Sequence, residues 1–194
     1  MRRQAGVSLV EVMVGVTLAG LLIAMAIPSF QQGNQNRQIR TAAETIQNGL
    51  QLARTEALQR NRIIRFQLLE ANGWRVGCDT PETNLIDGQQ ACPETLQERH
   101  PSEGSRTAEV ARVTVDRTSG ADSGAFDELK FTPLGRVSTL AAANNNAVFR
   151  VTNPGGGTCV AAGGDMRCLS VIVTTGGQVR MCDPAVASPD PRAC

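Results

Sequence analysis

The first thirty residues restrict what this chain can fold into more than any other part of it. The segment from Val7 to Ile27 is 21 residues long and contains a single charged side chain, Glu11. At ~1.5 Å per residue, a helix of this length spans roughly 31 Å, which is enough to cross the hydrocarbon of a bilayer. Arg2 and Arg3 precede the segment, so the positive-inside rule predicts a cytoplasmic N-terminus and an exported remainder.

Two general interpretations of this segment each leave something unexplained. A secretory signal peptide accounts for Ala24 and Ala26 as a small-residue cleavage site, but its apolar region runs only about 7–15 residues and carries no carboxylate. A plain membrane anchor accounts for the length. It does not account for Glu11, because an ionised carboxylate inside the membrane costs at least ~2.5–3.5 kcal/mol and normally has a partner.

The third interpretation is a resemblance to the type IV prepilins. A short basic leader ends in Gly6, the fifth residue after that glycine is Glu11, and Pro28 follows the apolar run. In that family a membrane peptidase cuts after the glycine and methylates the new N-terminal amine. The resemblance implies a leader over residues 1–6, a cut between Gly6 and Val7, and methylation of Val7, where the family usually has Phe.

Glu11 and Pro28 are the candidate assembly residues. Cutting after Gly6 would create an ammonium group at Val7, one helical turn from Glu11, and opposite charges attract strongly where the dielectric is low. Glu11 could pair with the amine of its own chain. The resemblance implies pairing with the amine of a neighbouring subunit, which would set the axial register of a helical bundle. Pro28 and Gly33 are expected to break or kink the helix where it leaves the bilayer.

The rest of the chain is predicted to form an α+β, pilin-like fold. Residues 7–28 would be the transmembrane or filament-core helix, and residues 29–62 its amphipathic continuation, packed on an antiparallel β head over residues 63–194. The apolar stripe of this continuation recurs at steps of three and four residues: it consists of Ile39, Ala43, Ile46, Leu50, Ala53 and Ala57. Because aromatic residues make up only 3% of the chain, we expect an aliphatic core.

The head shows alternating and β-branched stretches separated by turn signals. The predicted strands cover residues 63–69, 74–78, 110–115, 129–132, 136–138, 147–152, 169–174 and 178–181. Asn72 and Gly73 are predicted to form a hairpin turn. Residues 79–108, which are polar and contain three prolines, and residues 153–164, with five glycines, are predicted to be loops.

Three further stretches are similar to motifs of FimT/FimU/GspH-type minor pilins and pseudopilins: residues 48–57 followed by Arg60-Asn61-Arg62, residues 131–136, and residues 177–182. The resemblance implies a single-pass protein of the bacterial inner membrane with a periplasmic head. It would be processed by the prepilin peptidase and assemble with other pilins through its N-terminal helix. The implied role is in the initiation or tip complex of a type IV pilus, or as a pseudopilin of a type II secretion system.

Charge is distributed unevenly along the chain. Residues 37–65 carry six arginines and two glutamates, whereas residues 66–149 carry twelve acidic and seven basic side chains. The basic helix beside an acidic middle is either a solvated surface or a contact between like subunits, and the sequence leaves both interpretations open.

DNA binding is an alternative function that the resemblance suggests. Some FimT-type minor pilins bind DNA during transformation through a C-terminal Gly-Arg-x-Arg hairpin, and Gly177-Gln178-Val179-Arg180 keeps only the second arginine. Arg180, Arg167 and Arg192 are therefore the candidate DNA-binding residues. The four arginines and three aspartates of residues 150–194 leave a net charge of only +1, which is little for displacing counterions from a duplex.

The six cysteines favour disulfides in an oxidising periplasm, because their number is even and none belongs to a CxxC motif. They are Cys78, Cys92, Cys159, Cys168, Cys182 and Cys194. Cys78 and Cys92 are expected to pair across a local loop. For the other four, a Cys168–Cys182 bridge across the last hairpin, with Cys159–Cys194, is favoured over Cys159–Cys168 with Cys182–Cys194.

The sequence shows no sign of an enzyme. His100 is the only histidine and lies in a polar stretch, where we expect a solvated surface residue. No nucleophile elbow, phosphate-binding loop or metal-ligand cluster can be found. We therefore expect no catalytic residue, no metal, no cofactor and no small-molecule substrate.

Overall fold

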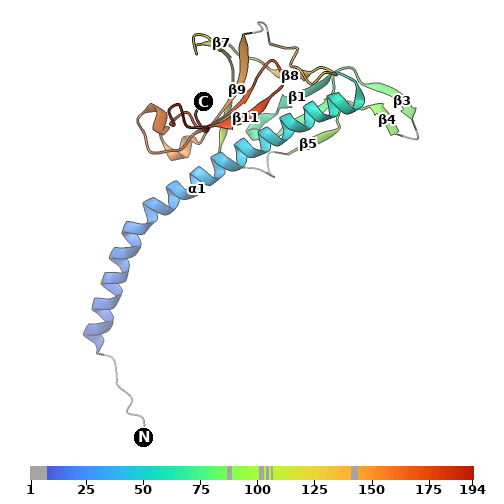
Figure 1. Ribbon diagram of the computed structural model, residues 1–194. Coiled ribbons are helices and arrows are strands. Elements are labelled where there is room, and N and C mark those ends of the chain that lie inside the picture. The colour runs from blue at the N-terminus through green and yellow to red at the C-terminus, as the bar shows by residue number, and fades with distance from the viewer. Residues whose placement is uncertain (1–7, 87–88, 101–102, 104, 106, 141–143) are drawn as a thin grey trace. The chain divides into compact units, whose positions relative to one another are not determined.

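Figure 1 shows the computed structural model of the chain, which describes residues 8–86, 89–100, 103, 105, 107–140 and 144–194. The side chains of residues 25–29, 71 and 83–90 are likewise outside this description. The chain divides into two compact units, Met1–Asn34 and Gln35–Cys194. One long helix, α1 (Leu9–Arg60), contributes to both units, and all of the described strands belong to the second unit.

The part of α1 in the first unit exposes its apolar side chains, as expected for a helix that needs a partner. The helix continues through Pro28 and Gly33, so of the break or kink predicted at these residues the break is not found. It ends at Arg60, where Asn61 adopts a positive φ of 53°. Asparagine tolerates this left-handed conformation, which commonly terminates a helix.

The second half of α1 packs on the strands of the second unit through its predicted stripe (Figure 1). All six stripe residues, from Ile39 to Ala57, have an exposed fraction of 0%. The polar side chains on the other sides of the helix remain accessible, among them Arg37, Arg40 and Glu44. The amphipathic prediction for this segment is therefore confirmed.

The first sheet is antiparallel, with the strand order β5-β2-β1-β8. Its strands are β1 (Ile64–Leu68), β2 (Trp74–Cys78), β5 (Gln97–Arg99) and β8 (Glu128–Phe131). The turn between β1 and β2 contains a short 3-10 helix, η1 (Glu70–Asn72), which ends at Asn72 with a φ of 68°. The hairpin predicted at Asn72 and Gly73 is thus present, with η1 as an added element.

The second sheet is also antiparallel, with the order β11-β10-β9-β6-β7. Its strands are β6 (Glu109–Asp116), β7 (Asp122–Gly124), β9 (Asn145–Thr152), β10 (Leu169–Val173) and β11 (Val179–Cys182). Along β9, Ala147, Phe149 and Val151 face the core, whereas Arg150 faces outward. The observed architecture is the predicted α+β fold, a long helix packed on antiparallel sheets.

The prediction of an unstructured loop over residues 79–108 is wrong. This stretch forms β3 (Glu82–Ile86), β4 (Gln89–Cys92) and β5, of which β3 and β4 pair with each other and β5 extends the first sheet. These strands are held by main-chain hydrogen bonds, so they need no alternation of apolar residues. Conversely, residues 136–138 form only an isolated bridge between Phe131 and Val137 in place of the predicted strand.

Two other local predictions need correction. The short polar strand β7 was not expected. Residues 153–164 contain two 3-10 helices, η3 (Pro154–Gly156) and η4 (Val160–Ala162), within the predicted loop.

The core is also less aliphatic than expected. Phe66 stacks edge-on against Phe149, with 5.7 Å between the ring centroids, and Phe126 and Trp74 extend this aromatic cluster. Four of the six aromatic residues of the chain therefore form one cluster, whereas Phe30 is exposed on α1.

The disulfides are Cys78–Cys92, as expected, and the less favoured alternative for the other four cysteines, Cys159–Cys168 and Cys182–Cys194. The favoured Cys168–Cys182 bridge is excluded by the register of the last hairpin, in which Ser170 lies opposite Cys182. The C-terminal tail instead returns to β11 through a parallel bridge between Asp183 and Ala193, which places Cys194 next to Cys182.

Candidate functional site

The first candidate surface is the exposed apolar part of α1. The large apolar side chains that are exposed here, each by more than half, are Leu9, Val10, Val12, Met13, Val14, Val16, Leu18, Leu21, Leu22 and Ile23. A continuous apolar surface of this extent marks a site of contact with lipid or protein. In the part of the chain that the structure describes, no helix combines the length and the apolar character that crossing a membrane requires.

Glu11 lies in the first turn of α1, exposed among these apolar side chains. Among the described residues its carboxylate has no partner, whereas the Thr17 hydroxyl donates to the carbonyl oxygens of Met13 and Val14. Glu11 is therefore the group on this surface that an external cation can satisfy. Gly6 and Val7, the expected cleavage and methylation sites, lie outside the described residues, as does the side chain of Pro28.

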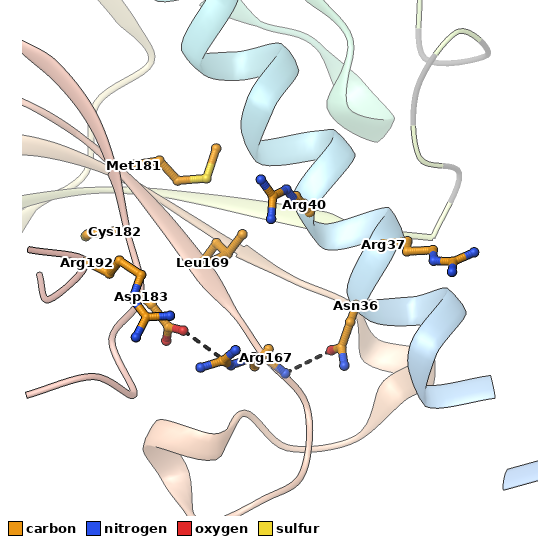
Figure 2. Close-up of a pocket in the computed structure, with 9 residues that line it drawn as sticks. All are labelled: Asn36, Arg37, Arg40, Arg167, Leu169, Met181, Cys182, Asp183 and Arg192. Atoms are coloured by element: carbon orange, nitrogen blue, oxygen red, sulfur yellow. Dashed lines mark hydrogen bonds and ion pairs between the residues drawn. The ribbon is translucent and has the colours of Figure 1, made fainter. Parts of the chain in front are cut away.

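The second candidate surface is a cavity of about 420 Å³ at the edge of the second unit, which we call the arginine pocket. It is lined by Asn36, Arg37, Arg40, Arg167, Leu169, Met181, Cys182, Asp183 and Arg192. Figure 2 shows that α1, the start of β10, the end of β11 and the C-terminal tail each contribute to it. Arg40 points toward Leu169 and Met181, and Arg37 projects from the other flank of α1 (Figure 2).

Hydrogen bonds position the residues of this pocket. The backbone N–H of Arg167 donates to Oδ1 of Asn36 at 3.0 Å, which ties the start of β10 to α1. The Arg167 guanidinium lies 3.4 Å from Oδ2 of Asp183, whose side chain is only 8% exposed. Asp183 also accepts a hydrogen bond from the backbone N–H of Ala185. This buried carboxylate is thus satisfied within the pocket wall.

Two of the other three arginines of the pocket are paired with neighbouring carboxylates. Arg192 binds Asp190 through two side-chain hydrogen bonds, and these, with a bond from the Arg192 backbone N–H, lower the pKa of Asp190 to about 2. Arg40 pairs with Glu44 at 2.8 Å on the exposed side of α1. The guanidinium of Arg37 has no partner among the described residues. The pocket therefore combines four arginines with an apolar lining of Leu169 and Met181, and carboxylates within the chain pair with three of those arginines.

The three arginines proposed from sequence do not form one surface. Arg167 and Arg192 line the arginine pocket. Arg180 is on β11, where it lies opposite Ile172 of β10 on the outer face of the sheet. Its two terminal nitrogens donate to the carbonyl oxygens of Ala193 and Cys194, at 3.0 and 2.7 Å. Arg180 thus anchors the C-terminal tail.

Sequence reasoning missed Arg37 and Arg40 as members of this site. The excess of arginine in residues 37–65 was the one sequence signal for these two side chains. The sequence does not show that they lie next to a C-terminal tail about 150 positions further along the chain.

The chemistry of these surfaces is association. His100 is exposed, and the described residues contain no group of three or more His, Cys, Asp or Glu side chains placed to hold a metal ion. The arginine pocket offers charge and apolar contact, and the start of α1 offers apolar contact and one carboxylate.

Comparison with known families gives two matches. Residues 42–177 match the family described as type II transport protein GspH, and residues 1–27 match the prokaryotic N-terminal methylation motif. The first match covers the second half of α1 and most of both sheets. No curated protein matches the sequence.

Comparison with solved structures finds the type IV minor pilin FimU of Pseudomonas aeruginosa PAO1 in two crystal forms. One is 21% identical over 79% of this chain and 94% of that chain, with a TM-score of 0.47. The other is 20% identical over 78% and 97% of the two chains, with a TM-score of 0.46.

Proposed function

Because this chain belongs to the GspH family and carries the N-terminal methylation motif, it is a minor pilin or pseudopilin, and we propose that it acts in the initiation or tip complex of a type IV pilus. Proteins of this family are structural and not enzymatic. Membership also implies anchoring in the inner membrane, processing by the prepilin peptidase and assembly with other pilins.

The observation that carries the proposal is the single carboxylate of Glu11 on an otherwise apolar, exposed helix surface. Such a group is costly in an apolar assembly unless a cation meets it. A cut after Gly6 supplies that cation as the amine of Val7. We propose that residues 1–6 are removed and that residues 7–28 form the membrane and filament-core helix. Residues 29–62 would then continue the helix under the head.

The assembly role of Glu11 can be tested in cells that produce the filament. The Glu11→Ala variant should reach the inner membrane at the wild-type level and be depleted from sheared filaments at least tenfold. Thr17→Val is the matched control, because it removes a polar group that is already satisfied within α1, and it should assemble normally. Normal incorporation of the Glu11→Ala variant would contradict the pairing role.

A type II secretion pseudopilin is the second candidate, which the description of the matching family favours. Deletion of the gene separates the two roles. Loss of surface filaments with normal secretion supports the pilus role, and loss of secretion with normal filaments supports the secretion role.

A further inference from the structure

Arg54 is a half-buried arginine on the second half of α1 that has no counterion. None of its side-chain nitrogens makes a hydrogen bond or an ion pair within the described part of the chain, and its Nε is closed off from solvent. Arg40 and Arg60 on the same helix differ, because each is paired with a glutamate one turn away. An arginine keeps its positive charge in proteins, so Arg54 cannot adapt to this position by losing a proton.

Two glycine turns hold the side chain of Arg54 in place. A Cβ at Gly135 would lie 3.2 Å from Nε of Arg54, and a Cβ at Gly177 would lie 3.3 Å from the same atom. Each turn is closed by a hydrogen bond from the N–H of its glycine, to the carbonyl oxygen of Thr132 in one case and of Thr174 in the other. Because Nε is packed against these turns, the terminal nitrogens are the part of the guanidinium that a partner can reach.

Gly135 is also the centre of an exposed surface, which we call the leucine–arginine patch and define as Arg54, Leu58, Leu134 and Arg136. Leu58 is 50% exposed, and its Cδ2 would lie 3.4 Å from a Cβ at Gly135. Leu134 precedes Gly135 and is 78% exposed, more than any other large apolar side chain that the structure describes. Arg136 follows Gly135, is exposed, and has a guanidinium without a partner in the described ranges.

The patch carries two positive charges that the chain does not neutralise. The stretches that meet at Gly135 are residues 51–62, 132–138 and 174–178, and Glu56 is the one acidic residue in their sequence. Its carboxylate lies 2.6 Å from Nε of Arg60 and is therefore taken. Arg62 is paired with Glu82. Arg54 and Arg136 are the surplus that remains once these pairs are counted.

Two cations beside two exposed leucines match a protein surface better than a nucleic acid or a bilayer. Leucine gains nothing from the phosphates of a duplex, and two cations displace few counterions. Arg54 lies roughly 28 Å along α1 from Gln35, the end of the unit to which the apolar segment is joined, which favours a protein over the bilayer. A carboxylate with an apolar neighbour answers both features, since it accepts two parallel hydrogen bonds from one guanidinium.

We propose that the leucine–arginine patch binds an aspartate or glutamate, flanked by an apolar side chain, on a different pilin subunit. A contact between two such patches is excluded, because it would bring arginines together. The inference rests on the proposed function in one respect, which is that this chain assembles with other pilins. The contact would use the end of α1 that Glu11 and the leader do not reach.

The test is photocrosslinking of the full chain in cells that produce the filament. Leu134 is replaced by p-benzoylphenylalanine, which keeps the position apolar. Illumination should link the chain to another protein with an N-terminal methylation motif, through a peptide that contains an aspartate or glutamate. Arg54→Glu should reduce this adduct at least about tenfold, because like charges then meet. Exchange of the partner's carboxylate residue for arginine should restore the adduct in the Arg54→Glu background.

Arg117→Glu is the matched control and should leave the adduct unchanged. Arg117 is also exposed and unpaired among the described residues, but it lies between β6 and β7 of the second sheet. Arg136→Glu changes only an exposed turn residue, so it should weaken the adduct even if Arg54→Glu lowers the melting temperature.

An adduct with a second copy, with lipid or with DNA overturns the proposal, as does the absence of any protein adduct. An adduct that neither arginine variant weakens, or that charge exchange does not restore, also overturns it. The pilus role is judged separately, because a linked pilin is expected in a pilus and in a secretion pseudopilus alike, and the phenotype of the gene deletion distinguishes these two.

Discussion

Gly177 lies so close to Gly135 that a Cβ at Gly177 would collide with the carbonyl oxygen of Gly135. A Cβ at either glycine would also lie 3.2–3.3 Å from Nε of Arg54. The three sequence stretches that resemble the minor pilin motifs, residues 48–57, 131–136 and 177–182, therefore meet at one point. Their resemblance reflects a single packing arrangement between α1 and two turns.

This contact predicts that Gly177→Ala destabilises the protein severely. Gly177 has a φ of 78°, which costs an alanine ~1–2 kcal/mol, and the collision with Gly135 adds ~1–3 kcal/mol. Gly163→Ala is the matched control, because Gly163 has a φ of 85° in the left-handed region but nothing within 4 Å of its Cβ position. Thermal unfolding should show a clearly larger loss for Gly177→Ala. Equal losses would mean that only the backbone conformation matters.

Gly49 has a different reason to be glycine, because it lies within a helix. A Cβ there would lie 2.8 Å from the Phe66 ring and 2.9 Å from the Trp74 ring. We predict that Gly49→Ala lowers the stability by about 1–2 kcal/mol, since overpacking outweighs the ~0.5–1 kcal/mol that alanine gains in a helix. Gly33→Ala, also in α1 but with open space around it, should not lower the melting temperature. An unchanged or raised melting temperature for Gly49→Ala would contradict this account of the core.

Much of this architecture could be predicted from sequence because its signals are local. The α1 stripe and the strand β6 are visible as periodic patterns of apolar residues. The strands β2, β10 and β11 are indicated by the turn residues of their hairpins. The strands β3, β4 and β5 could not be found in this way, because they are polar and are held by main-chain pairing.

The disulfide pairs and the arginine pocket could not be predicted for one shared reason, which is that they depend on contacts between distant parts of the chain. The correct disulfides depend on the hairpin register and on the return of the tail to β11. The arginine pocket joins Asn36 to Arg167, 131 positions apart.

The disulfide pattern predicts unequal contributions to stability. Replacing Cys78 and Cys92 by alanine should cost roughly 3 kcal/mol for a loop of this size, with a further loss because both sulfurs are buried in the core. Removing Cys159–Cys168, which closes a shorter loop nearer the surface, should cost less. Thermal unfolding of the two variants compares them, and a non-reducing digest identifies the pairs. A peptide linking Cys168 to Cys182 would contradict the structure.

The C-terminal tail should loosen in acid. Arg192 holds the pKa of Asp190 at about 2, below the ordinary value of an aspartate. A carboxyl whose pKa is lowered by folding stabilises the folded state fully above its unfolded pKa and loses that effect as the pH falls through the folded value. The protection of the Asp183 and Ala193 amides against hydrogen exchange, relative to an unfolded peptide at the same pH, should therefore decrease between about pH 4 and pH 2.

The Arg192→Gln variant separates this effect from general acid unfolding. It should raise the pKa of Asp190 toward its ordinary value and move the loosening of the tail to higher pH. Exchange at Asp122, whose own pKa is lowered by Arg150, should keep its wild-type pH dependence. A tail that responds to pH identically in both proteins would show that the Asp190–Arg192 pair does not hold it.

The proposed function requires that the carboxylate of Glu11 pairs with an amine that processing creates at Val7. Mass spectrometry of the N-terminal peptide, from protein extracted from membranes, tests it most directly. We predict that the mature chain begins at Val7 and that its amine is methylated, with no peptide retaining residues 1–6. A chain that keeps its leader, or one that begins after Ala26, would leave Glu11 without its partner and contradict the account.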